Sequence, residues 1–390
     1  MIELIGAICV AVPVTLALYA FLGYPVFLWL LARGRTTAKP QAEPAEWPLI
    51  TICLPAYNEE QAIARTLESL LGIDYPEDRR QILVVSDAST DRTDQIVRSF
   101  ADRGVELLRL DTRRGKTAAE NAAFPHCRGS ILVNTDATIR ILPNALKPLV
   151  AAFSDPHVGV ASGRDVSVGD LQTEGSQGES GYVGYEMWVR GLETAVGGIV
   201  GASGCFYGIR REIVDGAFPE MLSRDFASAL LAREHATRAV SVNDAVCLVP
   251  RTRDLKSEYR RKVRTMARGL ETLWFKRHLL NPVRHGSFAW MLWSHKLLRW
   301  LVFPSLILLP IGLTLLAIQA KVALVVVPLL VLGLLVGLAG LRWPEGRPMP
   351  VLVGIPSYLV ASSLAAIQAW SRALRGQRNA VWEPTRRPLA

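Results

Sequence analysis

Three aspartates are the leading candidates for functional residues in this sequence. Asp87 ends the segment QILVVSD, Asp136 ends SILVNTD, and Asp225 lies in SRDF. The first two follow short apolar runs typical of buried parallel strands, so we expect their carboxylates at the carboxyl edge of one sheet, where open α/β folds bind ligands. The pattern predicts a nucleotide-handling site there, although each aspartate alone is also typical of a helix cap or a strand-end turn.

Two further motifs stand at strand-to-helix turns. LPAYNEE (54–60) breaks an apolar strand at Pro55, and turns of this kind often hold nucleotides. RRGKTAAEN (113–121) imitates the end of a phosphate-binding loop, but Leu110 occupies the position where that loop needs glycine. What remains is a basic cluster at a helix start, which either faces a diphosphate or forms a solvated surface.

The small polar groups that follow the first two aspartates indicate what each could bind. Ser89, Thr90 and Asp91 follow Asp87 and are suited to hydrogen-bonding a base or a ribose. Thr138 lies two residues after Asp136, on the same side of an extended chain. Because Mg²⁺ and Mn²⁺ prefer oxygen ligands and are often shared with substrate phosphates, Asp136 could supply one ligand; a strand-end turn is the alternative.

Three later motifs complete the set. GASGCFYGIRREI (201–213) suits close backbone approach to a bulky ligand, or is a glycine-rich turn into a helix. Asp225 is either a general base for an acceptor hydroxyl or a first-turn acid that complements the helix dipole. YRRKVRTMARG (259–269) places three arginines on one helical face, which could hold a phosphate or lie on anionic lipid. These are Arg261, Arg264 and Arg268.

The elements that must position these residues alternate between strand and helix patterns. Strands LITICLPAY, QILVVSD, VELLRL and SILVNTD are separated by the helical patterns AIARTLESLL, TDQIVRSFADRG and KTAAENAAF. This alternation predicts an α/β domain with a mainly parallel sheet over residues 49–255. The five cysteines are single and scattered, so they indicate neither a zinc site nor a disulfide framework, and they fit a reducing cytosolic face.

Apolar segments flank this domain. The chain has 390 residues, 50% of them hydrophobic, and a net charge of +9, which we attribute to basic flanks on an anionic membrane surface and not to nucleic-acid binding. We expect a transmembrane helix over 1–32, a linker over 33–48, basic and interfacial helices over 256–300, transmembrane helices over 301–371, and a basic tail over 372–390. Within 301–371, the segments 301–318 and 322–341 read as strong spans and 351–370 as the weakest.

The orientation of the last span raises a conflict. Three crossings after a cytoplasmic domain would place the C-terminus outside. The arginines of the tail oppose this through the positive-inside tendency, so a re-entrant or interfacial path for the last segment is the alternative. We expect a multi-pass protein of the cell inner (plasma) membrane with a cytoplasmic catalytic domain.

The ordered series PAYNEE, SDAST, RRGKTAAEN, NTDAT, GASGCFYGIRRE, SRDF and RRKVR resembles membrane-bound family 2 glycosyltransferases with the GT-A fold, such as the bacterial cellulose, chitin, hyaluronan and poly-N-acetylglucosamine synthases. The resemblance covers roughly residues 49 to 300, and SHKLLRW and VWEPTRR extend it. It implies an inverting transfer of sugar from a UDP-sugar to a glycan or lipid-linked acceptor at the bilayer, and leaves any accessory subunit open.

The resemblance also implies roles for individual residues. The uridine part would be held by Ala56, Tyr57, Glu59 and Asp87, with Lys116 close to the nucleotide. Asp136 and Thr138 occupy the metal-binding element for Mg²⁺ or Mn²⁺, and Asp225 would be the catalytic base. The diphosphate and acceptor would meet Gly204, Arg261 and Arg264, and a gating segment with Trp382, Thr385 and Arg386.

The sequence departs from the family pattern at three places. Thr138 replaces the second aspartate of the metal element, Arg224 replaces the first acid of an acidic pair, and Arg261 and Thr265 replace a glutamine and a tryptophan that contacts the acceptor. These changes leave two alternatives to a polymer-extending synthase. One is a non-processive enzyme that adds one sugar to a lipid carrier, and the other is a non-catalytic membrane scaffold that senses nucleotide.

Overall fold

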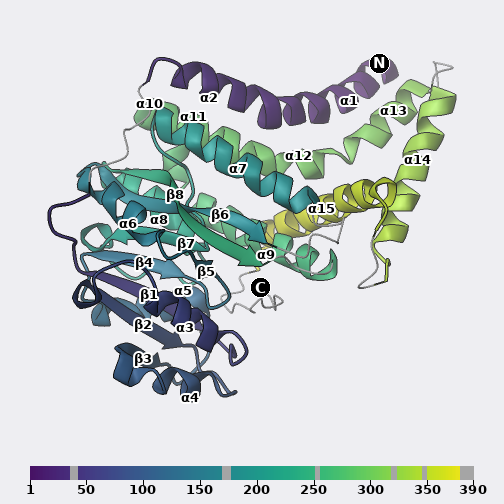
Figure 1. Cartoon of the computed structure of the whole chain (residues 1–390). Coiled ribbons are helices and arrows are strands. Elements are labelled where there is room, and N and C mark those ends of the chain that lie inside the picture. Colours follow the sequence, from purple (N-terminus) through teal and green to yellow (C-terminus); the bar gives the residue numbers. More distant parts are fainter. Residues whose placement is uncertain (36–42, 169–176, 251–254, 318–322, 345–348, 378–390) are drawn as a thin grey trace.

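The computed structural model describes residues 1–35, 43–168, 177–250, 255–317, 323–344 and 349–377. Figure 1 shows an α/β domain beside a group of long helices that includes both ends of the described chain. The predicted fold class is therefore confirmed.

One eight-stranded sheet forms the centre of the domain, in the order β3-β2-β1-β4-β7-β6-β8-β5. Strands β1, β2, β3 and β4 are parallel neighbours, whereas β7 runs antiparallel to both β4 and β6. The strands are β1 (Ile50–Ala56), β2 (Arg80–Ser86), β3 (Val105–Arg109), β4 (Ile131–Thr135), β5 (Arg140–Ile141), β6 (Val158–Val168), β7 (Phe206–Arg210) and β8 (Arg238–Pro250). The parallel strands therefore bring the ends of β1, β2 and β4, and with them Asp87 and Asp136, to one edge.

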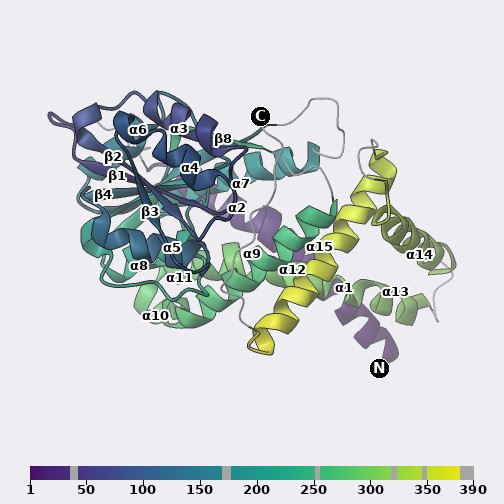
Figure 2. The same cartoon turned by 90° about the horizontal axis from the view of Figure 1, so that it is seen from below.

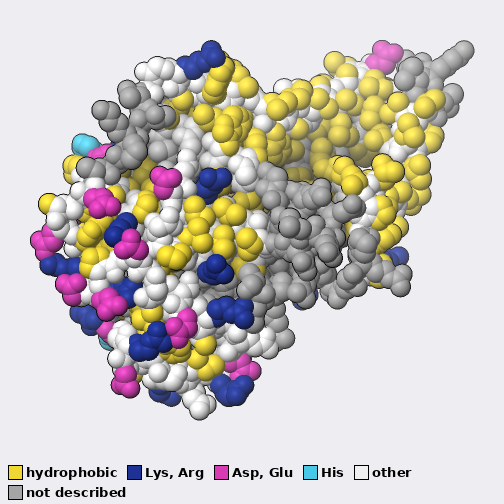
Figure 3. Space-filling view, in the orientation of Figure 1, with side chains coloured by type: hydrophobic (Ala, Val, Ile, Leu, Met, Phe, Trp, Pro, Cys, Tyr) yellow, Lys and Arg dark blue, Asp and Glu magenta, His cyan; other side chains and the backbone are white. Residues whose placement is uncertain are grey.

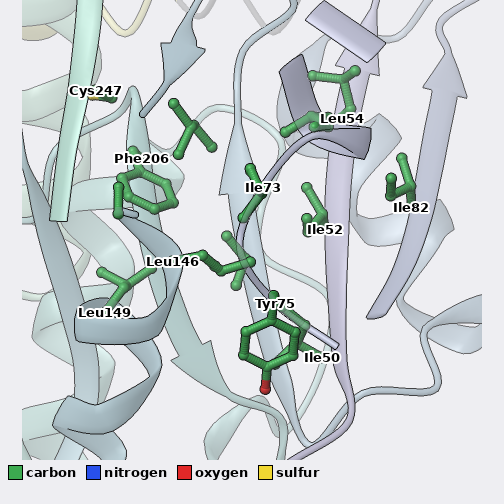
Figure 4. Close-up of a cluster of buried hydrophobic side chains, with 14 of the residues drawn as sticks. Ile50, Ile52, Leu54, Ile73, Tyr75, Ile82, Leu146, Leu149, Phe206 and Cys247 are labelled. Carbon is green, nitrogen blue, oxygen red and sulfur yellow. The ribbon is translucent and has the colours of Figure 1, made fainter. Parts of the chain in front are cut away.

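Helices cover both faces of this sheet (Figure 1). The helices of the domain and of the segment that follows it are α3 (Ile63–Leu71), α4 (Thr93–Arg98), α5 (Lys116–Ala123), α6 (Leu146–Ala151), α7 (Gln177–Val196), α8 (Arg224–Glu234) and α9 (Leu255–Phe275). Because β1 is buried on both sides, its side chains alternate between two cores. Ile50, Ile52 and Leu54 belong to one core, drawn in Figure 4, and Cys53 belongs to the other.

The remaining α- and π-helices are mostly apolar, with the short basic α10 as an exception. They are α1 (Ile2–Leu18), the π-helical η1 (Tyr19–Gly23), α2 (Tyr24–Ala32), α10 (Pro282–His285), α11 (Ser287–Leu292), the π-helical η9 (Trp293–Leu298), α12 (Arg299–Ser305), α13 (Leu308–Ala317), α14 (Ala323–Gly340) and α15 (Val351–Leu374). Figure 3 shows hydrophobic side chains gathered over this part and charged side chains over the α/β domain. This is the division expected of a domain attached to a bilayer.

Two described helices are long and apolar enough to cross a membrane, namely Ile2–Ala32 and Val351–Leu374. Ser287–Ser305 and Leu308–Ala317 form a further pair bent by 47°, and Val325–Gly340 is shorter. The predicted segment 351–370 lies within one of the two candidates, 301–318 falls on the bent pair, and 322–341 contains the shorter helix, so the relative strength of the three spans stays a prediction. Pro310, the third residue of α13, has no amide proton to donate to the Leu306 carbonyl, which accounts for the break between α12 and α13.

The apolar helices dock directly on the domain. Tyr24 and Leu28 of α2 share a buried core with Phe226 of α8 and Met291 and Leu292 of α11. Figure 2 shows α15 lying along α9, where Tyr259 donates to Gln368 and Lys262 donates to Ser362, both at 2.8 Å. The α8 end that carries Asp225 therefore faces the helical part of the molecule.

Candidate active site

The loops after β1 and β2 are joined to each other by hydrogen bonds. The amide of Asn58 donates to Ser89 Oγ, and Thr90 N donates to Asn58 Oδ1 at 2.8 Å. The amide of Glu60 donates to Asp91, and Glu59 N donates to Thr93 Oγ1 at 2.8 Å. The polar groups of Ser89, Thr90 and Asp91, predicted to meet a base or ribose, thus hold the neighbouring loop in place.

Asp87 shapes the start of α5. It is 3% exposed, and its two carboxylate oxygens accept the amides of Arg114 and Gly115, each at 2.8 Å. Gly115 has a φ of +96°, a conformation that favours glycine. The amide of Asp87 donates to the carbonyl of Ala56 at 2.9 Å, so Asp87 ties β1, β2 and α5 together. Its predicted contact with uridine stays a prediction.

Tyr57 presents an aromatic face at the end of β1. The Arg113 guanidinium lies 3.8 Å over its ring, in a cation–π arrangement. Both side chains are half-buried. The predicted uridine residues Ala56, Tyr57 and Glu59 therefore occupy one short stretch of the carboxyl edge, beside the basic loop 113–116.

Lys116 connects the strand ends to the loop before β7. Its ammonium lies 2.5 Å from Asp136 Oδ1 and 3.1 Å from the carbonyl of Gly204. Burial alone would lower the pKa of Lys116, but the negative charges of Asp136 and Glu120 outweigh it and raise this pKa above the usual lysine value. Lys116 therefore carries a fixed positive charge beside Asp136.

The carboxylates of the site fit a shared metal ion better than a site made by protein alone. Among the described residues, no group of three or more His, Cys, Asp or Glu side chains is placed to hold a metal. Asp136 and Thr138 both remain half-buried at the sheet edge and offer one carboxylate and one hydroxyl. Mg²⁺ is commonly held by one or two carboxylates together with substrate phosphates, and these residues fit that arrangement.

Asp225 lies against Gly204. The Ser223 hydroxyl donates to Asp225 Oδ1 at 2.6 Å, which leaves Oδ2 facing the glycine. A Cβ at position 204 would lie 3.2 Å from that oxygen, so a larger residue would crowd it. Since Lys116 also donates to Gly204, this glycine brings Lys116, Asp136 and Asp225 to one place.

Sequence reasoning missed the partner of Arg224. This residue is 6% exposed, and its Nε lies 3.4 Å from Glu120 Oε2, while Glu120 is 2% exposed. Arg224 also donates to Asn121 Oδ1 at 2.7 Å. Burial raises the pKa of Glu120, although the charges of Lys116 and Arg224 oppose this. Arg224 occupies the position at which the family pattern has an acid. Its buried carboxylate partner comes instead from Glu120 of α5.

The arginine stripe of α9 forms a helical face as predicted, but its members differ in role. Arg268 donates to the carbonyl of Glu220 at 2.7 Å and contacts Thr117 of α5, next to Asp225. Arg261 forms an ion pair with Glu258 at 2.7 Å within α9. Arg268, which was not among the predicted site residues, is therefore the stripe arginine that the structure places beside Asp225.

The glycine-rich turn of residues 201–204 leads into strand β7 (Phe206–Arg210), and a short 3-10 helix, Arg211–Ile213, follows the strand. Arg210 donates to the carbonyls of Val158, Phe153 and Asp155, and thereby secures the sheet. The gating residues Trp382, Thr385 and Arg386 lie outside the described residues.

Comparison with known proteins agrees with this arrangement. Residues 51–218 match the profile of "Glycosyl transferase family 2". The chain is 27% identical over 202 residues to a "Beta-monoglucosyldiacylglycerol synthase" of Nostoc sp., covering 50% of this chain and 43% of the relative. It is 32% identical over 137 residues to an "N-acetylglucosaminyltransferase" of Neorhizobium galegae, covering 34% of this chain and 31% of that protein. The chain thus spans less than half the length of these relatives.

A solved structure shares the fold over nearly the whole chain. It is "Mannosyltransferase PcManGT from Pyrobaculum calidifontis in complex with GDP-Man and Mn2+", with a TM-score of 0.70 and 22% identity, covering 97% of this chain and 100% of that one. At this identity the likeness concerns the fold. Taken with the family profile and the expected sheet, it shows that residues 51–218 are a glycosyl transferase family 2 domain of the GT-A type.

Proposed function

We propose that this protein is an inverting glycosyltransferase, which moves a sugar from a UDP-sugar to a glycan or lipid-linked acceptor at a membrane. The observation that carries the proposal is the meeting of two carboxylates and one ammonium at Gly204. Lys116 links Asp136 to the Gly204 carbonyl, and Asp225 Oδ2 faces the same glycine. One carboxylate is then placed for the leaving diphosphate and the other for the attacking hydroxyl.

The donor is proposed to lie along the ends of β1 and β2. Tyr57 offers an aromatic face to the base, and Arg113 and Lys116 offer positive charge to the phosphates. Asp87 acts on the donor through the loop it holds, since both of its oxygens accept backbone amides. The fixed loop reduces the ordering cost of nucleotide binding.

Mg²⁺ or Mn²⁺ is the proposed cofactor, held by Asp136, Thr138 and the phosphates of the donor. When bound, the ion neutralises charge that develops on the diphosphate as UDP leaves. Lys116 already places a cation on Asp136 Oδ1 and contributes to the same neutralisation.

Asp225 is proposed as the general base. Ser223 fixes Oδ1 through a 2.6 Å hydrogen bond, so Oδ2 is the oxygen available to the acceptor hydroxyl. Asp225 accepts the proton of that hydroxyl while its oxygen attacks the anomeric carbon and UDP departs from the opposite side. A single displacement inverts the anomeric configuration, so an α-linked donor gives a β-linked product.

The second candidate function is the addition of a single sugar to a lipid, and the residues on the acceptor side of the site favour it. Thr265, at the place of the acceptor-contacting tryptophan in processive synthases, is exposed on α9, and Arg261 is paired with Glu258. Helices long and apolar enough to cross a membrane dock on the α8 end of the site. A relative whose name states synthesis of a glucosyl lipid supports the same candidate.

The experiment is a donor screen on purified membranes that contain the full chain. UDP-glucose, UDP-N-acetylglucosamine, UDP-galactose, UDP-glucuronate and GDP-mannose are each supplied with radiolabelled sugar and Mg²⁺ or Mn²⁺. We expect one UDP-sugar to label a glycan or lipid product, with product size separating polymer from single addition. Binding of UDP with no turnover of any donor would favour the non-catalytic scaffold, and turnover of GDP-mannose alone would overturn the choice of UDP.

A further inference from the structure

Asp165 of β6 is a half-buried carboxylate beside the site that the proposed mechanism does not use. The hydroxyl of Ser203 donates to it and lies 2.6 Å from Oδ1 and 2.7 Å from Oδ2. The same hydroxyl accepts the amide of Cys205 at 3.1 Å. Because this second bond runs from residue 203 to residue 205, Ser203 closes a tight turn around Gly204, and Asp165 fixes the direction of its hydroxyl.

A β-bulge in β6 aims Asp165 at this turn. On a regular strand, residues three apart point to opposite faces of the sheet. Ser162 and Asp165 nevertheless both contact Ser203, whose amide donates to Ser162 Oγ at 2.8 Å. The pairing of β6 with β8 shifts in register between Ser162 and Arg164, with Gly163 between them. Such a bulge re-aims the side chains that follow it, which brings Asp165 to the same side as Ser162.

The bulge depends on Gly163. A Cβ at this position would lie 2.5 Å from the ring of Phe206 in β7 and 2.8 Å from the carbonyl of Ala245 in β8. Phe206 and Ala245 both belong to the buried core, so neither can give way easily. The sequence therefore supplies a glycine where β6 bends and a carboxylate two residues later, beside the turn.

The cations on the helical side hold the segment 201–205 less closely than β6 does. Arg190 of α7 lies 3.5 Å from Ser162 Oγ and 3.5 Å from the Ala202 carbonyl, at the limit of hydrogen bonding. Lys296 of η9 runs along Gly201, where a Cβ would lie 3.0 Å from its Cε. The shorter side-chain hydrogen bonds to this segment therefore come from β6.

We infer that Asp165 is a positioning residue of the transfer reaction. It acts through Ser203, which holds Gly204 in place, and the inference rests on the proposed function. The Gly204 carbonyl accepts from Lys116 at 3.1 Å, and a Cβ at Gly204 would lie 3.2 Å from Asp225 Oδ2. Movement of the turn would therefore displace both contacts, and a misplacement of about 1 Å can cost about 10²-fold in rate.

The test measures sugar transfer by the purified full chain with the donor found in the screen, together with UDP affinity by calorimetry and the melting temperature of each variant. Asp165→Ala should lower kcat about 10- to 10²-fold and leave the KM for the donor and the UDP affinity unchanged, because the nucleotide loops lie elsewhere. Ser203→Ala removes the same bond and should lose as much. The double variant should lose no more than either single variant, since both act through one bond.

Asp165→Asn keeps an oxygen that accepts from Ser203, so it should recover most of the lost turnover. Cys247→Ala is the matched control. The Cys247 thiol donates to Asp165 at 3.3 Å, so its removal alters the surroundings of this carboxylate and leaves the bond to Ser203 intact. We expect this control to keep full turnover.

Full turnover of Asp165→Ala, or losses that add up in the double variant, would overturn the inference. So would a lower melting temperature with normal turnover per folded molecule, because Asp165 would then stabilise the fold alone. If Asp165→Ala does not fold, Ser203→Ala decides the question, since it breaks the same bond and leaves the carboxylate in place. Failure of the proposed function is distinguishable, because the unmodified protein would then turn over no donor.

Discussion

The donor side and the acceptor side of the site differ in how their polar groups are satisfied. On the donor side, the loops after β1 and β2 bond to each other, and Asp87 accepts two amides of the third loop. On the acceptor side, Lys296 has no hydrogen-bonding partner within the described residues, and Arg190 has only long contacts. The loops after β1 and β2 are thus held in one arrangement by the protein itself, which lowers the ordering cost for the nucleotide proposed to bind there, whereas Arg190 and Lys296 are held less tightly.

Removing one partner of the buried ion pair between Glu120 and Arg224, which lies beneath both sides of the site, should have the largest effect on stability. Arg224→Met removes the ion-pair partner of the buried Glu120 carboxylate and leaves Lys116 as the other cation that acts on it, and we expect a loss of about 3–5 kcal/mol in the free energy of unfolding. The measurement is denaturant or thermal unfolding of the purified chain in detergent.

The double variant Glu120→Leu with Arg224→Met serves as its control. Replacing both charges removes the buried carboxylate, so most of the lost stability should return. If the double variant is as unstable as the sum of its single variants, the two residues are not coupled and this part of the account is wrong.

A substitution on the donor side should lower the free energy of unfolding by less than the loss of Arg224 does, and it should clearly weaken the binding of UDP. Asp87→Asn replaces one of two charge-assisted acceptors, and we expect about 1.5–3 kcal/mol less stability together with weaker UDP binding. Calorimetry with UDP and thermal unfolding check both effects. Asp102→Asn, at an exposed position, is the control and should change neither. Unchanged UDP binding in Asp87→Asn would show that the loop is not held for the nucleotide.

Acid should weaken the buried ion pairs between α7 and η9–α12, in which Glu186 contacts His295 and Arg299, each at 2.8 Å. Burial would raise the pKa of Glu186, but the positive charges and hydrogen bonds of His295 and Arg299 outweigh it and hold this pKa well below its usual value of 4.5. A depressed carboxyl pKa contributes stability that is present above the unfolded value and is lost as the pH falls below about 4.5. Melting temperature against pH should therefore decline in that range, and Glu186→Gln should decline less. Parallel curves would contradict this assignment.

The smallest effect is expected from the contact between the donor loops. Asn58→Ala removes the side chain that accepts from Thr90 N at 2.8 Å, at a position whose φ of +52° favours asparagine or glycine. We expect a loss of about 1 kcal/mol and a modestly weaker affinity for UDP. Asn58→Gly keeps the backbone conformation and removes the same bonds, so comparing the two variants separates strain from hydrogen bonding. No loss of UDP affinity in either variant would show that this contact does not support the donor site.

Sequence reasoning reached the strands and the strand-end residues because both depend on local pattern. The alternation of short apolar runs with helical segments was enough to place Asp87 and Asp136 at one sheet edge. The resemblance to family 2 enzymes extended this to the fold, which the comparisons confirm.

The contacts between side chains within the site could not be predicted from the local sequence pattern. Glu120 and Arg224 lie far apart in the chain, and so do Lys116 and Gly204 or Gly201 and Lys296. Each pairing depends on how α5, α8 and η9 pack around β7, and hydrophobic periodicity does not encode that packing. Arg210 shows the same limit, because only the packed sheet reveals that its side chain donates to the carbonyls of Val158 and Phe153.

The central claim is that Asp225 is the base of a sugar transfer. The direct measurement is transfer of radiolabelled sugar from the donor found in the screen, by Asp225→Asn and by the control Asp102→Asn, with UDP affinity measured on the same preparations. We expect Asp225→Asn to lose about 10²- to 10⁴-fold in turnover and to bind UDP normally, while Asp102→Asn keeps full activity. Turnover of Asp225→Asn near that of the unmodified protein would contradict it.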